Sequence, residues 1–404
     1  MKPGYKQTEA GVIPEEWEVK SLASLAERIM VGIASAATHA YRAKGVPMLR
    51  NQNIKSGYLD DGDLLFVDPE YEKTFRNKRL RGGDLLTART GYPGTTCVVP
   101  SGYESAQSFT TLITRPNTTE IDSSFLCHYI NSEEGQRFFE QGQIGGAQKN
   151  VNAGTLRKMP VPIPPPPEQR AIAEALSDVD VLLGAVDRLI TKKRDLKQAA
   201  MQQLLTGQTR LPGSHGKWEV KRFGEVALPR RERIDPRRVG VQDFCIELEH
   251  IASASGELLG STTTGDQSSL KSVFHPGDVL FGRLRAYLRK YWLATRAGVC
   301  STEVWVLAPK DRLVTTGFLF QLVKTDEFVE AASNSYGTHM PRSDWNIVKS
   351  YEFDLPPLGE QTAIAGVLGE MDAEMAGLAQ RREKTHALKQ AMMQELLTGR
   401  TRLV

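Results

Sequence analysis

Residues Pro164 to Leu211 read PPPPEQRAIAEALSDVDVLLGAVDRLITKKRDLKQAAMQQLLTGQTRL, and residues Pro356 to Leu403 read PPLGEQTAIAGVLGEMDAEMAGLAQRREKTHALKQAMMQELLTGRTRL. The two stretches align without a gap at an offset of 192 and share 23 of 48 residues, whereas chance would give only a few. Weaker repeats extend the pattern, because WEVK occurs at 17–20 and 218–221, and GDLL at 83–86 returns as GDVL at 277–280. Repeats of solenoid proteins are only about 20 to 50 residues long. The chain is therefore a duplicated unit, a module followed by a long helix, and we expect an approximate internal two-fold axis.

Each of the two stretches is predicted to form one long helix. It begins at prolines, which are tolerated in the first helical turn, and ends at Gly207 or Gly399, since glycine readily takes the left-handed conformation that closes a helix. Nearly 40 residues without proline lie between these signals, which gives a rod of about 55 Å. Apolar residues alternate steps of four and three, as in a coiled-coil seam, at Ile172, Leu176, Val179, Leu183, Val186 and Ile190, and again at Ile364, Leu368, Met371, Met375 and Leu378.

The seam is interrupted at the matching place in both copies, residues 191–195 and 381–386. Each helix therefore has two contact zones. One alternative is that each helix packs only on its own module, but a helix far above the mean length of about 12 residues is too long for such a module to cover. We predict an antiparallel pair that holds the modules apart, with faces left over for other subunits. The residues proposed to bind partners are Ile172, Leu176, Leu196, Met201, Leu204, Ile364, Leu368, Leu388, Met393 and Leu396.

The segments before the helices are predicted to be mixed α/β modules. Short apolar runs such as 63–67, 84–88, 96–99 and 304–307 are separated by turn residues and indicate strands, and residues 124–141 and 316–333 each indicate one helix. The expected fold class is α+β: two mixed α/β modules at 1–163 and 212–355, separated by two long antiparallel coiled-coil helices at 164–211 and 356–404. Outside the matched motifs the two modules differ freely in sequence. We therefore expect them to share a structural framework and to differ in their surfaces.

Polar and basic clusters follow strands in both modules. Arginine can take two acceptors of a guanine edge, Gln and Asn can do the same for adenine, and Lys, Arg and Tyr can hold phosphates. The alternative is that each cluster is an ordinary solvated loop, but the clusters recur at equivalent places in the two units. The candidate DNA-binding residues are Arg89, Thr90, Tyr92, Gln148, Lys149 and Asn150 in the first module, and Arg283, Arg285, Tyr287, Arg289, Lys290, Thr338, His339 and Arg342 in the second.

The sequence offers no catalytic or metal signature. There is no GxxxxGK[ST] phosphate loop, no glycine-rich cofactor fingerprint after a strand, and no HExxH. The four cysteines lie far apart without metal or disulfide spacing. The net charge is only +3, and neither a signal peptide nor a membrane span of about 20 apolar residues is present. We expect a cytoplasmic binding platform with no catalytic residue and no metal site of its own.

The order and spacing of these motifs resemble the specificity subunit of Type I restriction-modification systems over the full chain. The pieces that carry the resemblance are IPEEWEVKSL at 13–22, GDLLTARTGYPG at 83–94, GDVLFGRLRAYLRK at 277–290, the PPxxEQ start of each helix and its LLTGxTRL end. The resemblance implies two target-recognition domains that each read half of a split double-stranded DNA target. It also implies that the helices bind two modification subunits.

The activities that this resemblance implies belong to the assembled complex. The modification subunits would bring S-adenosylmethionine and adenine N6-methylation, and ATP-dependent, Mg-dependent restriction subunits would make the complex a translocating endonuclease. Two other interpretations remain open on the sequence. One is a structural adaptor that joins other proteins through its coiled coil, and the other is a self-contained DNA methyltransferase, which the missing cofactor motifs disfavour.

Overall fold

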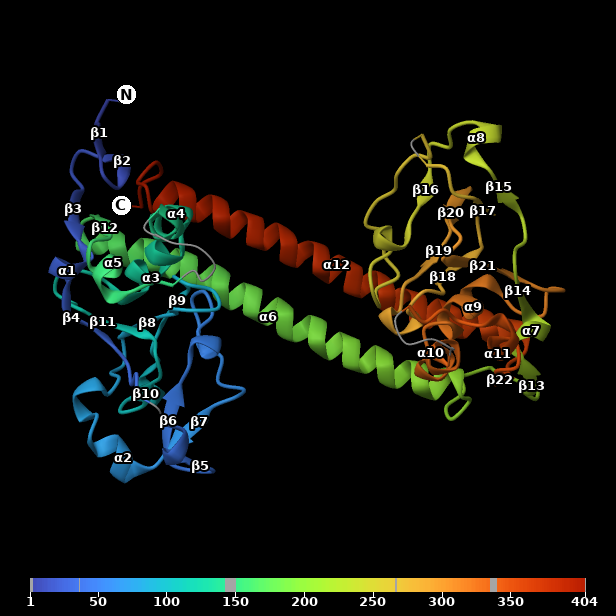
Figure 1. Ribbon diagram of the computed structural model, residues 1–404, viewed down its shortest axis with the longest axis horizontal. Coiled ribbons are helices and arrows are strands. Elements are labelled where there is room, and N and C mark those ends of the chain that lie inside the picture. The colour runs from blue at the N-terminus through green and yellow to red at the C-terminus, as the bar shows by residue number, and fades with distance from the viewer. Residues whose placement is uncertain (1–2, 36, 142–149, 266, 335–339, 404) are drawn as a thin grey trace. The chain divides into compact units, whose positions relative to one another are not determined.

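The computed structural model describes residues 3–35, 37–141, 150–265, 267–334 and 340–403 of the 404-residue chain. It contains two compact units: unit 1 comprises Met1–Asp187 with Arg381–Val404, and unit 2 comprises Arg188–Gln380. The two longest helices, α6 (Pro166–Leu205) and α12 (Leu358–Leu396), each contribute one part to both units (Figure 1). The boundaries between the compact units fall inside both long helices, whereas the sequence predicts each helix as a segment of its own. The four predicted domains therefore stay a prediction.

Unit 1 is built on small antiparallel and mixed sheets. Its strands are β1 (Tyr5–Thr8), β2 (Gly11–Pro14), β3 (Glu18–Ser21), β4 (Ala26–Val31), β5 (Tyr41–Arg42), β6 (Val46–Leu49), β7 (Leu65–Val67), β8 (Leu85–Thr87), β9 (Thr96–Val98), β10 (Gln107–Ser108), β11 (Leu112–Pro116) and β12 (Pro160–Ile163). They form the sheets β4-β11-β8-β9 and β10-β6-β7-β5 and the pairs β1-β2 and β12-β3. The apolar runs predicted at 63–67, 84–88 and 96–99 lie in β7, β8 and β9, so these strands are confirmed.

Unit 2 repeats the central part of this arrangement. Its strands are β13 (Glu219–Arg222), β14 (Ala227–Pro229), β15 (Arg233–Ile234), β16 (Cys245–Ile246), β17 (Lys271–Phe274), β18 (Val279–Gly282), β19 (Tyr291–Leu293), β20 (Gly298–Ser301), β21 (Val304–Pro309) and β22 (Glu352–Leu355). The sheet β14-β21-β18-β19 matches β4-β11-β8-β9 strand for strand, and both are antiparallel. The second sheets differ, because β7 pairs with β6 in unit 1, whereas β17 pairs with β20 in unit 2. The frame is therefore duplicated and the outer sheet has diverged.

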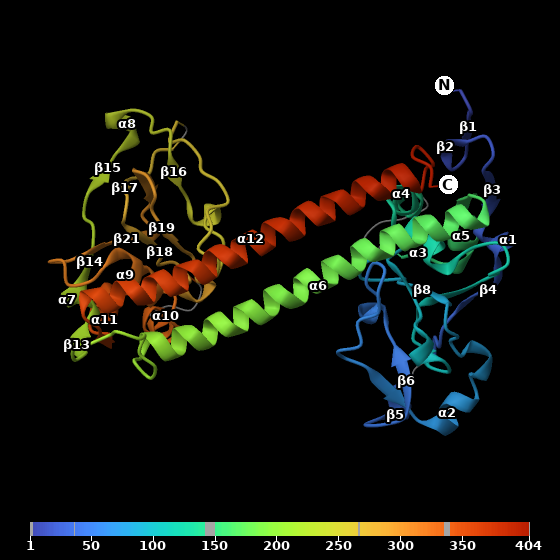
Figure 2. The ribbon, with the colours of Figure 1, turned by 180° about the vertical axis from the view of Figure 1, so that it is seen from behind.

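Short helices connect the strands of each unit. They are α1 (Leu22–Leu25), α2 (Pro69–Lys73), α3 (Ser123–Asn131), α4 (Glu133–Gln141) and α5 (Ala153–Arg157) in unit 1, and α7 (Phe223–Val226), α8 (Pro236–Val239), α9 (Thr316–Leu322), α10 (Asp326–Ser333) and α11 (Trp345–Val348) in unit 2. Figure 2 shows α3 and α5 beside the first turns of α6, and α9 and α11 beside those of α12. The expected α+β class is confirmed.

The single helices predicted at 124–141 and 316–333 are each two helices. In unit 1 the break falls at Ser132, whose hydroxyl accepts a hydrogen bond from the backbone N–H of Gly135 at 3.2 Å. In unit 2 Thr325 caps α10 by accepting from the N–H of Phe328 at 3.2 Å. Hydroxyl side chains at such positions satisfy backbone donors that a new helix leaves free, so they favour a restart over a continuous helix.

Cross-helix ion pairs confirm that α6 and α12 are antiparallel within each unit. In unit 1 Asp187 pairs with Arg382 at 2.5 Å and Asp180 with Lys389 at 2.6 Å. In unit 2 Lys193 pairs with Glu374 at 2.7 Å and Lys197 pairs with Asp372. Positions on one helix rise as those on the other fall, which only antiparallel neighbours allow. Ion pairs therefore join the two helices near the place where the apolar seam is interrupted.

In each unit, residues that the two copies share at the helix ends form hydrogen bonds with one another. In unit 1 Glu168, at the start of α6, accepts from the indole N–H of Trp17 at 3.1 Å and from Nε and Nη2 of Arg402 at 2.6 and 2.8 Å. In unit 2 Glu360 accepts from the indole of Trp218 at 2.9 Å and from Arg210 at 3.0 and 2.6 Å. Each glutamate is therefore bound by an arginine from beyond the end of the opposite helix.

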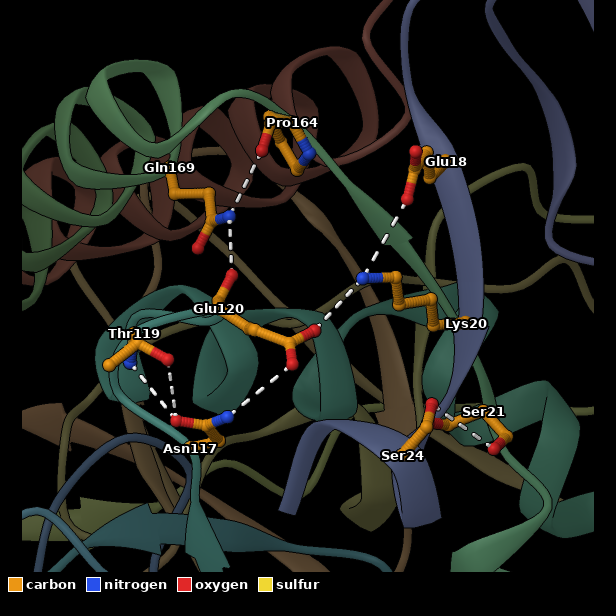
Figure 3. Close-up of polar contacts among 9 residues, drawn as sticks. All are labelled: Glu18, Lys20, Ser21, Ser24, Asn117, Thr119, Glu120, Pro164 and Gln169. Carbon is orange, nitrogen blue, oxygen red and sulfur yellow. Dashed lines mark hydrogen bonds and ion pairs between the residues drawn. The ribbon is translucent and has the colours of Figure 1, made fainter. Parts of the chain in front are cut away.

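The glutamine of the EQ motif fixes the first turn of each long helix. Gln169 donates to the carbonyls of Pro164 at 2.9 Å and Glu120 at 3.1 Å, as Figure 3 shows. Gln361 makes the matching bonds to the carbonyls of Pro356 at 2.8 Å and Leu313 at 3.0 Å. Both amide groups satisfy buried backbone carbonyls, which would otherwise be costly. These hydrogen bonds explain why the glutamine of the EQ motif recurs in both copies.

Two matching aspartates of the helix pair, Asp180 and Asp372, are half-buried and bind buried lysines. Asp180 binds Lys389, and Asp372 binds Lys197 and, at 2.7 Å, Lys324. All three lysines are buried. The environments differ, because unit 1 places His128 near Asp180 and unit 2 places two lysines around Asp372. The aspartate at this helix position therefore binds one more buried lysine in unit 2 than in unit 1.

We expect His128 to make the stability of unit 1 depend on pH. Burial first, and the charge of Lys389 second, lower the pKa of His128 from 6.5 to about 4. The unfolded chain therefore binds a proton between about pH 6.5 and 4 that the folded unit does not, so the free energy of unfolding falls as the pH falls, by up to about 1.4 kcal/mol per pH unit. The variant His128→Gln carries the side chain of the equivalent Gln321 and should lose this part of the pH dependence. Urea unfolding at pH 7, 6 and 5 measures it, and equal slopes for both proteins would contradict the prediction.

Candidate nucleic-acid interface

In unit 1 the predicted arginine turn follows the end of β8. The backbone N–H of Arg89 donates to the side-chain oxygen of Asn51 at 2.8 Å, and its carbonyl accepts from the N–H of Val151 at 3.2 Å. Asn51 also donates to the hydroxyl of Thr110 at 3.3 Å. The main chain of Arg89 is thus held from both sides. Its neighbours Thr90 and Tyr92 are exposed, and Tyr92 has 83% of its surface accessible.

In unit 2 the equivalent turn follows β18. The N–H of Arg283 donates to the carbonyl of Glu303 at 2.9 Å, and its carbonyl accepts from the N–H of Ser343 at 2.8 Å. An antiparallel bridge between Leu284 and Arg342 continues the contact. The arginine turn and the segment around Arg342, which the sequence marked as separate candidates, are therefore joined by main-chain contacts.

The two arginines share an unusual feature. Arg89 and Arg283 are each half-buried, and the Nε of each is buried without a hydrogen-bond partner among the described residues. A buried donor left unpaired costs free energy, so such a group is suited to an external acceptor. Because the feature recurs at equivalent positions of both units, it points to a shared binding role for these turns.

Other candidates on the second turn divide into exposed and internally bonded residues. Arg285 is exposed and Tyr287 is 55% exposed, so both face solvent. Arg289 pairs with Asp326 and also donates to the carbonyl of Lys324. Lys290 donates to the carbonyls of Leu248 and Ile251, both at 2.8 Å. The charged ends of Arg289 and Lys290 are therefore used to hold the turn, which leaves them less free for DNA than expected.

Arg342 is the one described residue among the three candidates at 338–342. Arg342 makes a bidentate ion pair with Glu303 at 2.8 to 3.0 Å, and this hydrogen bonding lowers the pKa of Glu303. Asn150 is exposed beside Val151 in unit 1. The remaining candidates lie outside the described residues: Gln148, Lys149, Thr338 and His339.

Most of the proposed partner-binding residues form the cores of the units. Buried there are Ile172, Leu176, Met393 and Leu396 in unit 1 and Leu204, Ile364 and Leu368 in unit 2, while Met201 is half-buried against the second core. The modules thus cover the helix ends, as the alternative interpretation of the sequence required. Leu196 and Leu388, in contrast, are 48% and 55% exposed. We therefore keep the prediction of partner binding for Leu196 and Leu388 only.

Sequence reasoning missed several residues that shape these turns. Asn51, Glu303 and Ser343 hold the arginine main chains, and the guanidinium of Arg283 lies 5.7 Å from the ring centre of Trp305. Their role depends on pairing between distant segments, so no local motif marks them. Within the described chain no group of three or more His, Cys, Asp and Glu residues is placed to hold a metal ion. No described helix is both long and apolar enough to cross a membrane.

Comparison with known proteins gives a consistent result. The family model for the Type I restriction modification DNA specificity domain matches residues 14–190 and 249–385, well over half of the chain. The putative type I restriction enzyme MjaX specificity subunit of Methanocaldococcus jannaschii is 25% identical and covers 99% of this chain and 97% of its own length. The type I restriction enzyme EcoDI specificity subunit of Escherichia coli is 26% identical over 60% of this chain and 61% of its own.

Two solved structures share the fold. The S subunit of a Type-I restriction-modification system from M. genitalium is 14% identical, with a TM-score of 0.60 and coverage of 98% of this chain and 99% of its own. A chain from a structure described as the basis of complex assembly and conformational transition of the type I R-M system has a TM-score of 0.54, 17% identity and coverage of 96% and 99%. At these identities the likeness concerns the fold alone.

Proposed function

The chain belongs to the family of Type I restriction-modification DNA specificity subunits, and from this premise we propose that it reads a bipartite DNA target. Each module would read one half-site through the turn that follows β8 or β18. The frames of these turns are duplicated while their surroundings differ, which supports two different half-sites. The observation that carries the proposal is the pair of half-buried arginines, Arg89 and Arg283, each with an unpartnered Nε in an equivalent turn.

Partners would supply the chemistry of the complex. We propose two modification subunits that bind S-adenosylmethionine and methylate adenine at N6, and restriction subunits that use ATP and Mg, with this chain non-catalytic. The matched exposed residues Leu196 and Leu388 support two equivalent partner sites, since exposed leucines at the same position of both helices offer the same apolar contact.

Mapping of N6-methyladenine across a genome that carries this system tests the proposal. We expect one target made of two defined half-sites separated by undefined bases, with their centres about 10 bp apart, because two readers on one face of B-DNA are spaced by a helical turn. A continuous target without a spacer would contradict bipartite reading. A mobility-shift assay with the chain and its modification subunits distinguishes this function from that of a structural adaptor, since an adaptor shows no sequence-dependent binding to DNA.

A further inference from the structure

Unit 2 contains a pocket beside its arginine turn. The pocket has a volume of about 370 Å³ and is lined by Arg283, Trp305, Arg342, Ser343, Asp344 and Trp345. Ligand pockets span about 300 to 1,000 Å³, so this one suits a small group. Arg283 follows the end of β18, Trp305 lies in β21, and Ser343 leads into α11. The backbone hydrogen bond from Ser343 to Arg283 joins two of these segments at the pocket.

Two polar atoms of this wall lack partners within the described chain. Ser343 is only 2% exposed, and its hydroxyl makes no hydrogen bond to any described residue. The Nε of Arg283 is buried and unpaired in the same way. A buried hydroxyl and a buried N–H offer two donors and one acceptor. They suit the edge of a ligand that carries both kinds of group.

The other walls are flat and aromatic. Trp305 and Trp345 lie edge to face with ring centres 5.6 Å apart, and the guanidinium of Arg283 lies 5.7 Å from the centre of the Trp305 ring. Aromatic rings and guanidinium planes are the surfaces on which unpaired nucleobases stack. Trp305 is only 8% exposed and is stacked with Phe281, so Trp345 and the guanidinium of Arg283 are the planar groups available for stacking beside the hydrogen-bonding groups.

The charges of the lining disfavour a phosphate. Arg342 is neutralised by its bidentate pair with Glu303. The carboxylate of Asp344 also lines the pocket and accepts from the N–H of Asn346 at 2.8 Å. Arg283 is thus opposed by Asp344, and the site is close to neutral. A neutral planar group fits this balance better than an anion.

We propose that this pocket holds an unpaired nucleobase of the bound DNA, taken out of the stack within the half-site read by unit 2. The inference rests on the proposed function. It applies to unit 2 because the strand position that carries Trp305, opposite Phe281, is occupied in unit 1 by Leu112, opposite Thr87. The two modules then differ in mechanism as well as in sequence preference.

Binding of duplexes with one mismatched pair, scanned across both half-sites, tests the proposal in the complex of the full chain with its modification subunits. At one position of the second half-site a mismatch should tighten binding by roughly tenfold or more, because the cost of unpairing a flipped base is then largely removed. Trp345→Leu should abolish this gain, and Trp345→Phe should retain most of it. Ser343→Ala removes only an unpartnered hydroxyl, so folding should be unaffected while the gain falls at least roughly threefold, as for loss of one hydrogen bond.

The scan across the first half-site is the matched control and should show no position that depends on Trp345. A gain at the methylated adenine that is equal in every variant belongs to the modification subunits and would not support the pocket. The proposal is overturned if no other position gains from a mismatch, or if the gain survives in both Ser343→Ala and Trp345→Leu. Absence of sequence-dependent binding to fully paired DNA would instead overturn the proposed function, so the two failures are distinct.

Discussion

Replacement of Asp372 by alanine should destabilise unit 2 by about 3–5 kcal/mol, because removal of one partner leaves buried charge uncompensated. Asp372 is the shared partner of Lys197 and Lys324, and both ammonium groups are buried. Four of the five tryptophans belong to unit 2. Urea unfolding followed by tryptophan fluorescence therefore reports mainly on the affected unit.

The pH dependence of this variant separates lost charge compensation from lost packing. Burial already lowers the pKa of Lys324 from 10.5 to about 8, and removal of Asp372 should lower it further. Above this pKa the folded unit holds one proton fewer than the unfolded chain, so stability rises with pH. Below about pH 8 the wild type keeps Lys324 charged and does not gain stability in this way, whereas above it both proteins gain equally. The deficit of Asp372→Ala should therefore shrink as the pH rises from about 7 to about 8 and stay constant above that.

Two controls accompany this variant. Asp180→Ala removes the matching carboxylate in unit 1, where Lys389 is the buried cation and His128 is neutral near pH 7, so its deficit should be smaller. Adding Lys324→Met to Asp372→Ala should restore part of the stability, because one of the stranded charges is removed. An Asp372→Ala deficit that is independent of pH and unchanged by Lys324→Met would contradict the charge explanation.

Replacement of both Arg89 and Arg283 by glutamine should weaken binding of the methylation target by about 2–6 kcal/mol, since each arginine contact with a base is worth about 1–3 kcal/mol. This corresponds to roughly 30-fold to more than 10,000-fold in Kd. The losses should add because the two arginines belong to different compact units. Titration of the complex with target duplex at one fixed salt concentration measures the change.

The single variants and a charge-matched control make this result specific. Arg89→Gln should relax selectivity in one half-site and Arg283→Gln in the other. Arg238→Gln removes the same charge from a side chain in unit 2 that is 86% exposed, and should alter binding to all sequences alike and only weakly. If the arginine variants lost affinity equally for target and unrelated DNA, their turns would be general anchors and would not read the sequence.

The long helices and the frame of the modules were predictable because their signals are local. Prolines, left-handed glycines and heptad spacing lie within the helices themselves, and Gly207 and Gly399 have the expected positive φ of 70° and 68°. The candidate site was predictable only in part. Arg89 and Arg283 stand in marked motifs. Asn51 reaches Arg89 through its side chain, and Glu303 and Ser343 reach Arg283 through their main chains, all from distant segments, which no spacing in the sequence encodes.

The sequence by itself determined the duplication, the two antiparallel helices and the positions of the arginine turns, because each follows from repetition or from a short-range pattern. Only the tertiary structure decided which face of each helix is covered. Leu196 and Lys197 are neighbours, as are Leu388 and Lys389, and hydrophobicity alone assigns the leucines to the interior. The structure buries the lysines and exposes the leucines. The reason is that Asp372 and Asp180 on the facing helix bind the lysines, so a charge supplied by the other copy sets the rotation of the helix.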